Sequence, residues 1–184
     1  METLRSIQQR ASLVTQVSPR EVEQEKINKV LDAARFAPSA MNKQPWRFIV
    51  VKGKAAVEKL VDESFAKWNL KARESSVIII VCANPKDDVV VGGREYYLFD
   101  VALAIENMIL AATDLGLVTH LMTSVDEEKI KKILNIPEEV RFVVATPLAY
   151  PAGGAYEKAA QERLKQRVRK GLAEVVYQGS WGKP

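Results

Sequence analysis

The chain has 184 residues, 47% of them apolar and 27% charged, a composition that supports a folded core and excludes a wholly disordered or collagen-like chain. The net charge is +4, and residues 157–170 alone account for it, with six basic and two acidic side chains. Because the excess charge lies in one short segment, a local anion site is favoured over a general nucleic-acid surface.

The N-terminal region predicts two helices. Apolar residues at helical spacing predict the first over roughly 15 residues from the N-terminus. Ser18 supplies a capping hydroxyl, Pro19 suits a first helical turn and Glu21 completes a capping box. A second helix is therefore expected to begin there and to end at Pro38.

The middle of the chain predicts two strands separated by a helix. Residues 46–51 predict a strand that Gly53 ends, and residues 57–65 predict a helix. Residues 77–82 form a continuous apolar run, which is typical of a central strand buried on both faces. Residues 86–94 predict an exposed loop.

The longest predicted helix covers residues 97–115 and is apolar on more than one face, so we expect it to be deeply buried. Gly116 marks its end. A short strand is expected over residues 118–122. Ser124 and Glu127 have the spacing of a capping box, which predicts that the next helix opens there.

The C-terminal part predicts a strand over residues 141–150, a basic helix near residues 157–170 and an apolar tail over residues 172–176. A terminal arm too short to fold alone often docks on a partner subunit. We therefore expect one domain over residues 1–184, with residues 171–184 as a C-terminal arm.

Cysteine and histidine each occur once, at Cys82 and His120. One cysteine excludes an intrachain disulfide and a zinc ribbon, and one histidine excludes a multi-histidine metal site. Cys82 is expected in the core and His120 as a packing or hydrogen-bonded residue. The N-terminus lacks a signal-peptide pattern and the longest apolar run is too short to cross a membrane, so we expect a cytoplasmic protein.

Two basic segments could hold an anion. Arg10, Ala11 and Ser12 offer a guanidinium fork, backbone N–H groups and a hydroxyl, the parts of a phosphate cradle, or else a solvated helix face. Residues 167–170 could provide a second grip on a phosphate, or complement the dipole of a helix end.

A third segment, residues 37–46, connects a helix to a strand through two prolines. Ser39 and Asn42 carry polar atoms that could meet the edge of a heteroaromatic ring. The alternative is a polar turn beside a core tryptophan.

The segment from Leu31 to Val51, with its Ala-Pro-Ser and Asn-x-Gln-Pro-Trp motifs, closely resembles the signature of the FMN-dependent nitroreductase family. The resemblance extends in order over essentially the whole chain. Its other parts are Arg10-x-Ser12, Asp100 with residues 106–112, and residues 115–126, 133–137, 147–151 and 169–176.

The resemblance implies an α+β fold: a three-layer α/β/α sandwich around a mostly antiparallel sheet, in an intertwined homodimer with a C-terminal arm that wraps the partner. It implies two FMN sites at the subunit interface. Arg10, Ala11, Ser12 and Arg169 would hold the FMN phosphate.

The resemblance also assigns the groups around the flavin ring. The partner subunit would line the flavin and ribityl chain with the segment Pro38, Ser39, Ala40, Met41 and Asn42. Backbone groups of Met122, Thr123 and Ser124 would face the ring, with the Thr123 N–H near flavin N5.

Three features depart from the family pattern. Val14 stands where a second basic residue is frequent, a loss that weakens phosphate binding unless Lys165, Arg167 or Lys170 compensates. Thr123-Ser124 occupies a place that often holds glycine or an acidic residue, and the side chains there would narrow the space above the ring. The 86–94 loop, where substrate contacts are frequent, is short.

The resemblance implies an NAD(P)H oxidoreductase with FMN as cofactor and NADH or NADPH as electron donor. Hydride would pass through flavin N5, in a ping-pong cycle, to a small organic acceptor of the nitroaromatic, quinone or enone type. The catalytic set would include no side chain or metal. The alternatives are a non-catalytic flavin-binding or storage protein of the same fold and, more distantly, a basic nucleic-acid-binding module.

Overall fold

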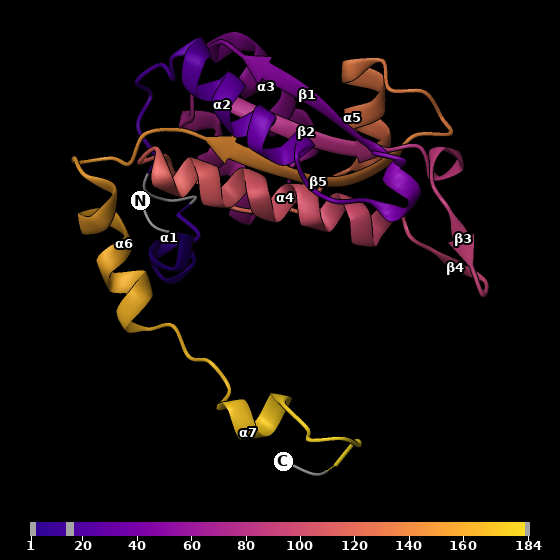
Figure 1. The fold of residues 1–184 in the computed structure, drawn as a ribbon. Helices are drawn as coiled ribbons and strands as arrows, with labels where there is room; N and C mark the ends of the chain where they lie inside the picture. The colour runs from indigo at the N-terminus through magenta and orange to yellow at the C-terminus, as the bar shows by residue number, and fades with distance from the viewer. Residues whose placement is uncertain (1–2, 14–16, 183–184) are drawn as a thin grey trace.

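The computed structural model describes residues 3–13 and 17–182 (Figure 1). A three-stranded antiparallel sheet forms its centre, with β2 (Val77–Ala83) between β1 (Trp46–Lys52) and β5 (Arg141–Leu148). Every residue of β2 is buried, as its continuous apolar run predicts.

Helices cover both faces of this sheet. On one face, α2 (Gln24–Arg35) and α4 (Tyr97–Asp114) pack against one set of alternating β2 side chains. On the other face, α3 (Lys54–Ser64) and α5 (Glu127–Leu134) pack against the intervening set. The predicted α+β fold around an antiparallel sheet is confirmed.

A third apolar cluster joins the two ends of the chain. α1 (Thr3–Gln9) is followed by the buried residues Ala11 and Leu13, which pack with residues of α6 (Tyr156–Lys165). In place of the predicted strand over residues 118–122, the backbone makes isolated bridges, with Ser12 beside Thr119. This arrangement lays the end of α1 along the segment that follows α4.

The remaining short elements lie at the edges. They are η1 (Ala40–Asn42), η2 (Lys67–Glu74), η3 (Pro85–Asp87), β3 (Val90–Val91), β4 (Arg94–Glu95) and α7 (Leu172–Val175). The loop expected over residues 86–94 is therefore partly ordered as the β3–β4 hairpin. Gly92 and Gly93 both have positive φ angles, which suit the tight turn between these strands.

Three predicted helix boundaries are wrong. α1 ends at Gln9, whereas the spacing predicted about 15 residues. α2 begins at Gln24 rather than near Ser18, because the Val22 N–H donates to the Ser76 hydroxyl and holds the preceding residues outside the helix. The basic helix ends at Lys165.

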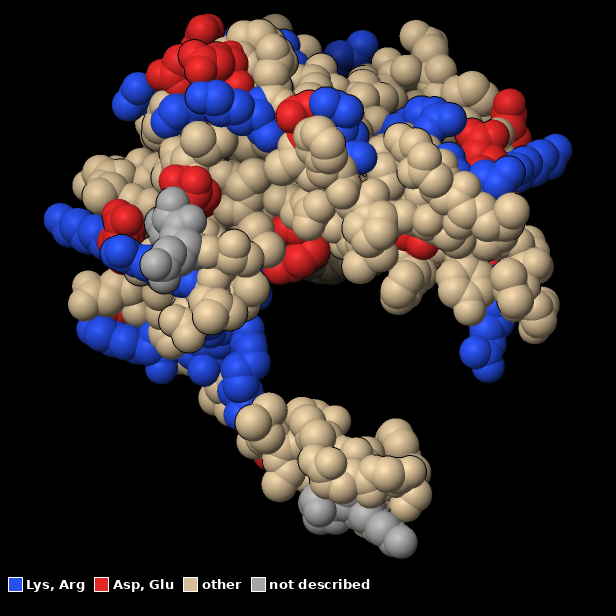
Figure 2. Space-filling model, viewed as in Figure 1, with Lys and Arg blue, Asp and Glu red and all other residues tan. Residues whose placement is uncertain are grey.

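The C-terminal arm extends away from the body (Figure 1). Figure 2 shows it beneath an open concave face, with Lys and Arg gathered where it leaves α6. Leu172 is 78% exposed and Trp181 is 88% exposed. No helix in the described part of the chain is both long and apolar enough to cross a membrane.

Candidate functional site

A cavity of about 350 Å³ brings the predicted phosphate-binding residues together. It lies between the end of α1, the segment after α4, and α6 with the start of the arm. Its lining residues are Arg10, Ala11, Ser12, His120, Arg163, Leu164, Gln166, Arg167 and Arg169. Four positive charges thus surround one small space, and no acidic side chain of the described residues lines it.

Backbone hydrogen bonds fix the path of the chain along one wall of this cavity. The Ala11 N–H donates to the Tyr156 hydroxyl at 2.8 Å, and the Leu13 N–H donates to the Thr119 carbonyl at 3.1 Å. Ser12 lies between these two anchors and is exposed. Its hydroxyl is therefore held at the surface by a rigid backbone.

The arginines of the cavity have different roles within the chain. Arg167 donates to the backbone carbonyls of Gln8 and Arg10, at 2.6 and 3.1 Å, and so ties the start of the arm to the end of α1. Arg169 donates only to the adjacent Val168 carbonyl among the described residues. The side chains of Arg10 and Arg163 have no hydrogen-bond or ion-pair partner among the described residues. Their guanidinium groups remain available to an anion.

His120 completes the wall. Its backbone N–H donates to the Thr146 hydroxyl of β5, and its Nδ1 is buried without a hydrogen-bond partner in the described structure. Burial and, secondarily, the nearby Arg163 charge lower the pKa of His120 below its ordinary value. The imidazole is consequently neutral at pH 7 when no anion is present.

A dianionic phosphate group fits these residues. It matches a cavity with four guanidinium groups, an exposed hydroxyl and an unpartnered imidazole nitrogen. Val14, at which the sequence departs from the family pattern, lies outside the described residues. Arg163 was missed as a site residue. It lies in the last turn of α6, whereas Arg167 and Arg169 follow the end of that helix at Lys165.

The predicted flavin-lining segment forms a strained loop. Met41, Asn42 and Gln44 all have positive φ angles, a conformation that costs non-glycine residues free energy and is concentrated at functional sites. Met41 is 83% exposed.

Two side chains hold this loop. Asp100, which is 1% exposed, accepts a hydrogen bond from the Ala40 N–H at 2.6 Å, and the Ser39 hydroxyl accepts one from the Gln44 N–H. Burial raises the pKa of Asp100, while the Ala40 hydrogen bond opposes this change.

Within one chain, the flavin-lining loop and the arginine cavity lie at opposite ends of α4. Asp100 is in the first turn of α4, whereas Thr119 and His120 follow its last residue, Asp114. The structure therefore brings Arg10, Ser12 and Arg169 together but does not place residues 38–42 beside them. Within a single chain, the two halves of the predicted site, the arginine cavity and the flavin-lining loop, are therefore separated.

The third predicted group is Met122, Thr123 and Ser124, which follows His120 in the segment after α4. Met122 is buried and paired with Ala145 of β5, whereas Thr123 and Ser124 are exposed. The Thr123 N–H donates no hydrogen bond within the described residues. The Ser124 carbonyl accepts a hydrogen bond from the Ala66 N–H. The residue that caps α5 is Asp126, whose side chain accepts from the Lys129 N–H.

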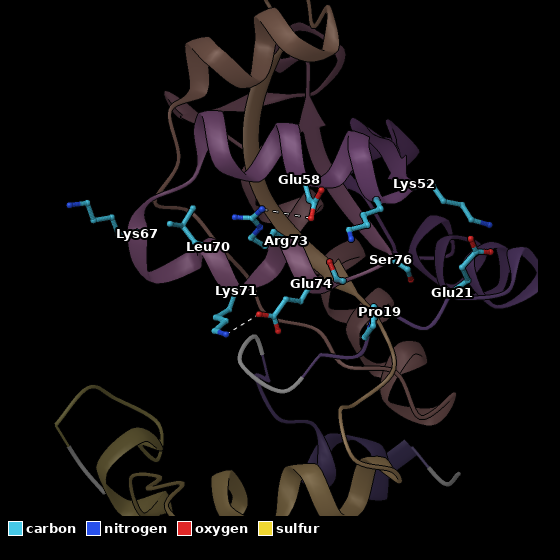
Figure 3. A pocket seen from close by; sticks show the side chains of 13 residues that line it. Pro19, Glu21, Lys52, Glu58, Lys67, Leu70, Lys71, Arg73, Glu74 and Ser76 are labelled. Atoms are coloured by element: carbon cyan, nitrogen blue, oxygen red, sulfur yellow. Dashed lines mark hydrogen bonds and ion pairs between the residues drawn. The ribbon is translucent and has the colours of Figure 1, made fainter.

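A larger cavity, of about 800 Å³, lies on the α3–η2 side (Figure 3). Four of its charged side chains form ion pairs with one another, Arg73 with Glu58 and Lys71 with Glu74. Lys67 and Lys52 point outward in Figure 3. The cavity contains none of the predicted site residues.

Cys82 lies in the core, as predicted, and is 1% exposed. Burial raises the pKa of its thiol to about 11, so the thiol stays protonated and unreactive at neutral pH.

Comparisons with known proteins show the family to which the chain belongs. The nitroreductase family model matches residues 7–150. A Methanothermobacter thermautotrophicus protein, provisionally named an NADH dehydrogenase/NAD(P)H nitroreductase, is 35% identical over 156 residues, which cover 83% of this chain and 78% of that protein.

Solved structures share the fold. A nitroreductase family protein from Clostridium novyi NT superposes with a TM-score of 0.77 at 32% identity, covering 100% of this chain and 96% of the other. A structure described as an oxidoreductase containing FMN superposes with a TM-score of 0.76 at 22% identity, covering 97% and 92%.

Proposed function

Because the chain belongs to the nitroreductase family, we propose that it is an FMN-dependent NAD(P)H oxidoreductase that reduces a small organic acceptor of the nitroaromatic, quinone or enone type by a ping-pong cycle. The observation that carries this proposal is the cavity in which Arg10, Ser12 and Arg169 meet. These are the residues that the sequence resemblance assigns to the FMN phosphate.

In this proposal, the chain's own residues bind and orient the cofactor. Arg10, Arg163 and Arg169 offset the phosphate charge, and Ser12 offers its hydroxyl and the adjacent backbone. A guanidinium presents several N–H donors in a planar fork, which suits phosphate oxygens. Arg167 contributes charge while its hydrogen bonds hold the arm in position.

The flavin-lining loop of a second copy would complete the site. The loop lies far from the arginine cavity of its own chain, yet it is held in a strained and exposed conformation. We propose a homodimer in which Pro38, Ser39, Ala40, Met41 and Asn42 of one subunit reach the cavity of the other. The single domain of residues 1–184 would include an arm, residues 171–184, that packs on the partner.

The groups of Met122, Thr123 and Ser124 would lie along the ring, and the free Thr123 N–H would donate to its N5 edge. When bound, FMN supplies the hydride chemistry, while the protein supplies binding, orientation and electrostatics. The buried, protonated Cys82 takes no part.

The first experiment is the absorption spectrum of the purified protein, before and after anaerobic addition of NADH or NADPH. We expect flavin bands in the visible region that bleach with one or both nucleotides and return when an acceptor such as a quinone is added. Acid release of the flavin followed by chromatography identifies it as FMN.

Two results would contradict the proposal. A yellow protein whose bands resist both nucleotides, while dithionite bleaches them, would indicate flavin binding or storage without this activity. A colourless protein that also fails to bind added FMN would limit the family inference to the fold.

A further inference from the structure

Among the described residues that line the cavity, His120 is the one with a buried side-chain polar atom that has no hydrogen-bond partner. The imidazole lines the same cavity as Arg10, Ser12 and Arg169, and its Nδ1 is buried without a partner. A buried polar atom of this kind normally finds a hydrogen-bond partner. Its position is also well determined, because its backbone N–H donates to Thr146 and its neighbour Thr119 pairs with Ser12.

The charged groups that face His120 are all basic. The end of α1 contributes Arg10, α6 contributes Arg163, and the segment after α6 contributes Arg167 and Arg169. The contact from β5 is the Thr146 hydroxyl, which does not titrate near neutral pH. Within residues 3–13 and 17–182, no carboxylate lines this space to stabilise a protonated imidazole.

We propose that His120 is a phosphate-binding residue whose imidazole takes up a proton from solvent when a phosphate group enters the cavity, so that phosphate binding and proton uptake are coupled. The identity of the phosphate as that of FMN rests on the proposed function, whereas the coupling itself requires only a phosphate group.

Electrostatics gives the direction of this coupling. Without an anion, burial and Arg163 hold the pKa of His120 below its ordinary value. A negative charge within about 4–6 Å favours a protonated imidazole and raises its pKa by about 1–3 units, and a phosphate monoester carries between −1.5 and −2 charges near pH 7. Occupancy therefore raises the pKa of His120 and increases the fraction of protonated imidazole beside the phosphate.

The proposed coupling makes phosphate affinity depend on pH. The His120 contribution to phosphate binding is present below the pKa of the occupied state and is lost as the pH rises through that value. The phosphate itself loses its second proton near pH 6, and this change strengthens binding as the pH rises. The two effects oppose each other, so comparison with a variant that lacks the imidazole is needed to separate them.

Nuclear magnetic resonance tests the coupling directly, because the chain has a single histidine. In tag-free, full-length protein freed of flavin, the imidazole Cε1–H signal belongs to His120 alone. We expect its titration midpoint to rise by about 1–3 pH units with saturating inorganic phosphate or FMN, and to stay in place with riboflavin, which lacks the phosphate. An unchanged midpoint with bound phosphate or FMN would overturn the proposal.

Affinity measurements provide the second test. His120→Gln should weaken FMN binding about tenfold near pH 6.5 and by less than about twofold near pH 8.5, with riboflavin affinity unchanged at both values. Lys158→Gln is the matched control, because it removes an exposed positive charge of α6 that does not line the cavity. Equal loss at both pH values, or the same pH profile in both variants, would contradict the coupling.

These outcomes distinguish the two proposals. If FMN binds and bleaches while the His120 titration does not move, the coupling fails and the proposed function stands. If inorganic phosphate shifts the His120 titration but FMN is not bound, the proposed function fails and the phosphate site with its histidine stands.

Discussion

Arginine side chains in the cavity show that the same residue type can stabilise the fold or remain available to a ligand. Arg167 directs its guanidinium to the carbonyls of Gln8 and Arg10, so its removal would loosen the junction of arm and body. Arg10 contributes its carbonyl to that junction, while its guanidinium is unpaired within the described chain. Arg10 is therefore the better residue for testing anion binding without disturbing the fold.

Replacement of Arg10 by alanine should weaken FMN binding by about 1.5–3 kcal/mol, the range for a hydrogen bond to a charged group. Fluorescence titration of flavin-free protein measures this change. Riboflavin binding should be unaffected because it lacks the phosphate. Arg73→Ala serves as the control, since Arg73 pairs with Glu58 and Asp62 on the α3–η2 side. An unchanged FMN dissociation constant in Arg10→Ala would remove Arg10 from the cradle.

The sequence predicted part of this cavity for a physical reason. Arg10 and Ser12 are adjacent along the chain, so a motif can identify them, and the basic composition near Arg169 identifies the second grip. His120 and Arg163 enter only through the tertiary path that sets α6 against the segment after α4. Nothing in their local sequence specifies that contact.

At the scale of elements, the end of α4 shows local sequence and structure in agreement. The Leu117 N–H donates to the Ala112 carbonyl and the Gly116 N–H to the Thr113 carbonyl, the pair of hydrogen bonds that defines a Schellman motif. Gly116 has a φ of +72°, and Leu117 is buried beyond it. The glycine therefore ends α4 and directs the chain toward Thr119 and the cavity.

Gly116→Ala should lower the free energy of unfolding by about 1–2 kcal/mol, because a Cβ is unfavourable in the left-handed conformation. A Cβ at this position would meet no atom within 4 Å, so this loss reflects backbone strain rather than a clash. Denaturant unfolding at one fixed protein concentration measures it. Gly171→Ala is the control, because Gly171 has a φ of −65°. Equal stability of the two variants would contradict the strain argument.

Helix beginnings were harder to predict than this helix end. Ser18 and Ser124 each stand in a good capping pattern, yet neither caps a helix. Long-range hydrogen bonds lie at both sites: the Val22 N–H donates to the Ser76 hydroxyl, and the Ala66 N–H donates to the carbonyl of Ser124. A capping motif reports only local preference, and these long-range bonds are invisible to it. The buried β2 strand, by contrast, was predicted correctly because continuous apolarity already encodes burial on both faces.

At the scale of the whole molecule, one chain has apolar surface without a partner. The apolar side chains exposed on α4, the flavin-lining loop and the arm are Met41, Leu98, Phe99, Leu172, Val175, Val176 and Trp181. Contiguous exposed apolar surface commonly marks an interaction site. The arm also leaves an open concave face beneath α4 (Figure 2). The proposed homodimer would cover these groups and join the two separated halves of the flavin site.

Deletion of residues 172–184 should therefore weaken the dimer while leaving each subunit folded, because the arm lies outside the three buried clusters. Sedimentation velocity over a concentration series measures association, and far-ultraviolet circular dichroism checks the fold. The truncation keeps Arg169, so retained phosphate binding would separate loss of association from loss of the cradle. Trp68→Ala removes another exposed tryptophan, on the η2 side, and should leave association unchanged. A truncated protein that stays dimeric at the lowest concentration would show that the arm is not an interface element, because its exposed apolar side chains would then contribute nothing to association.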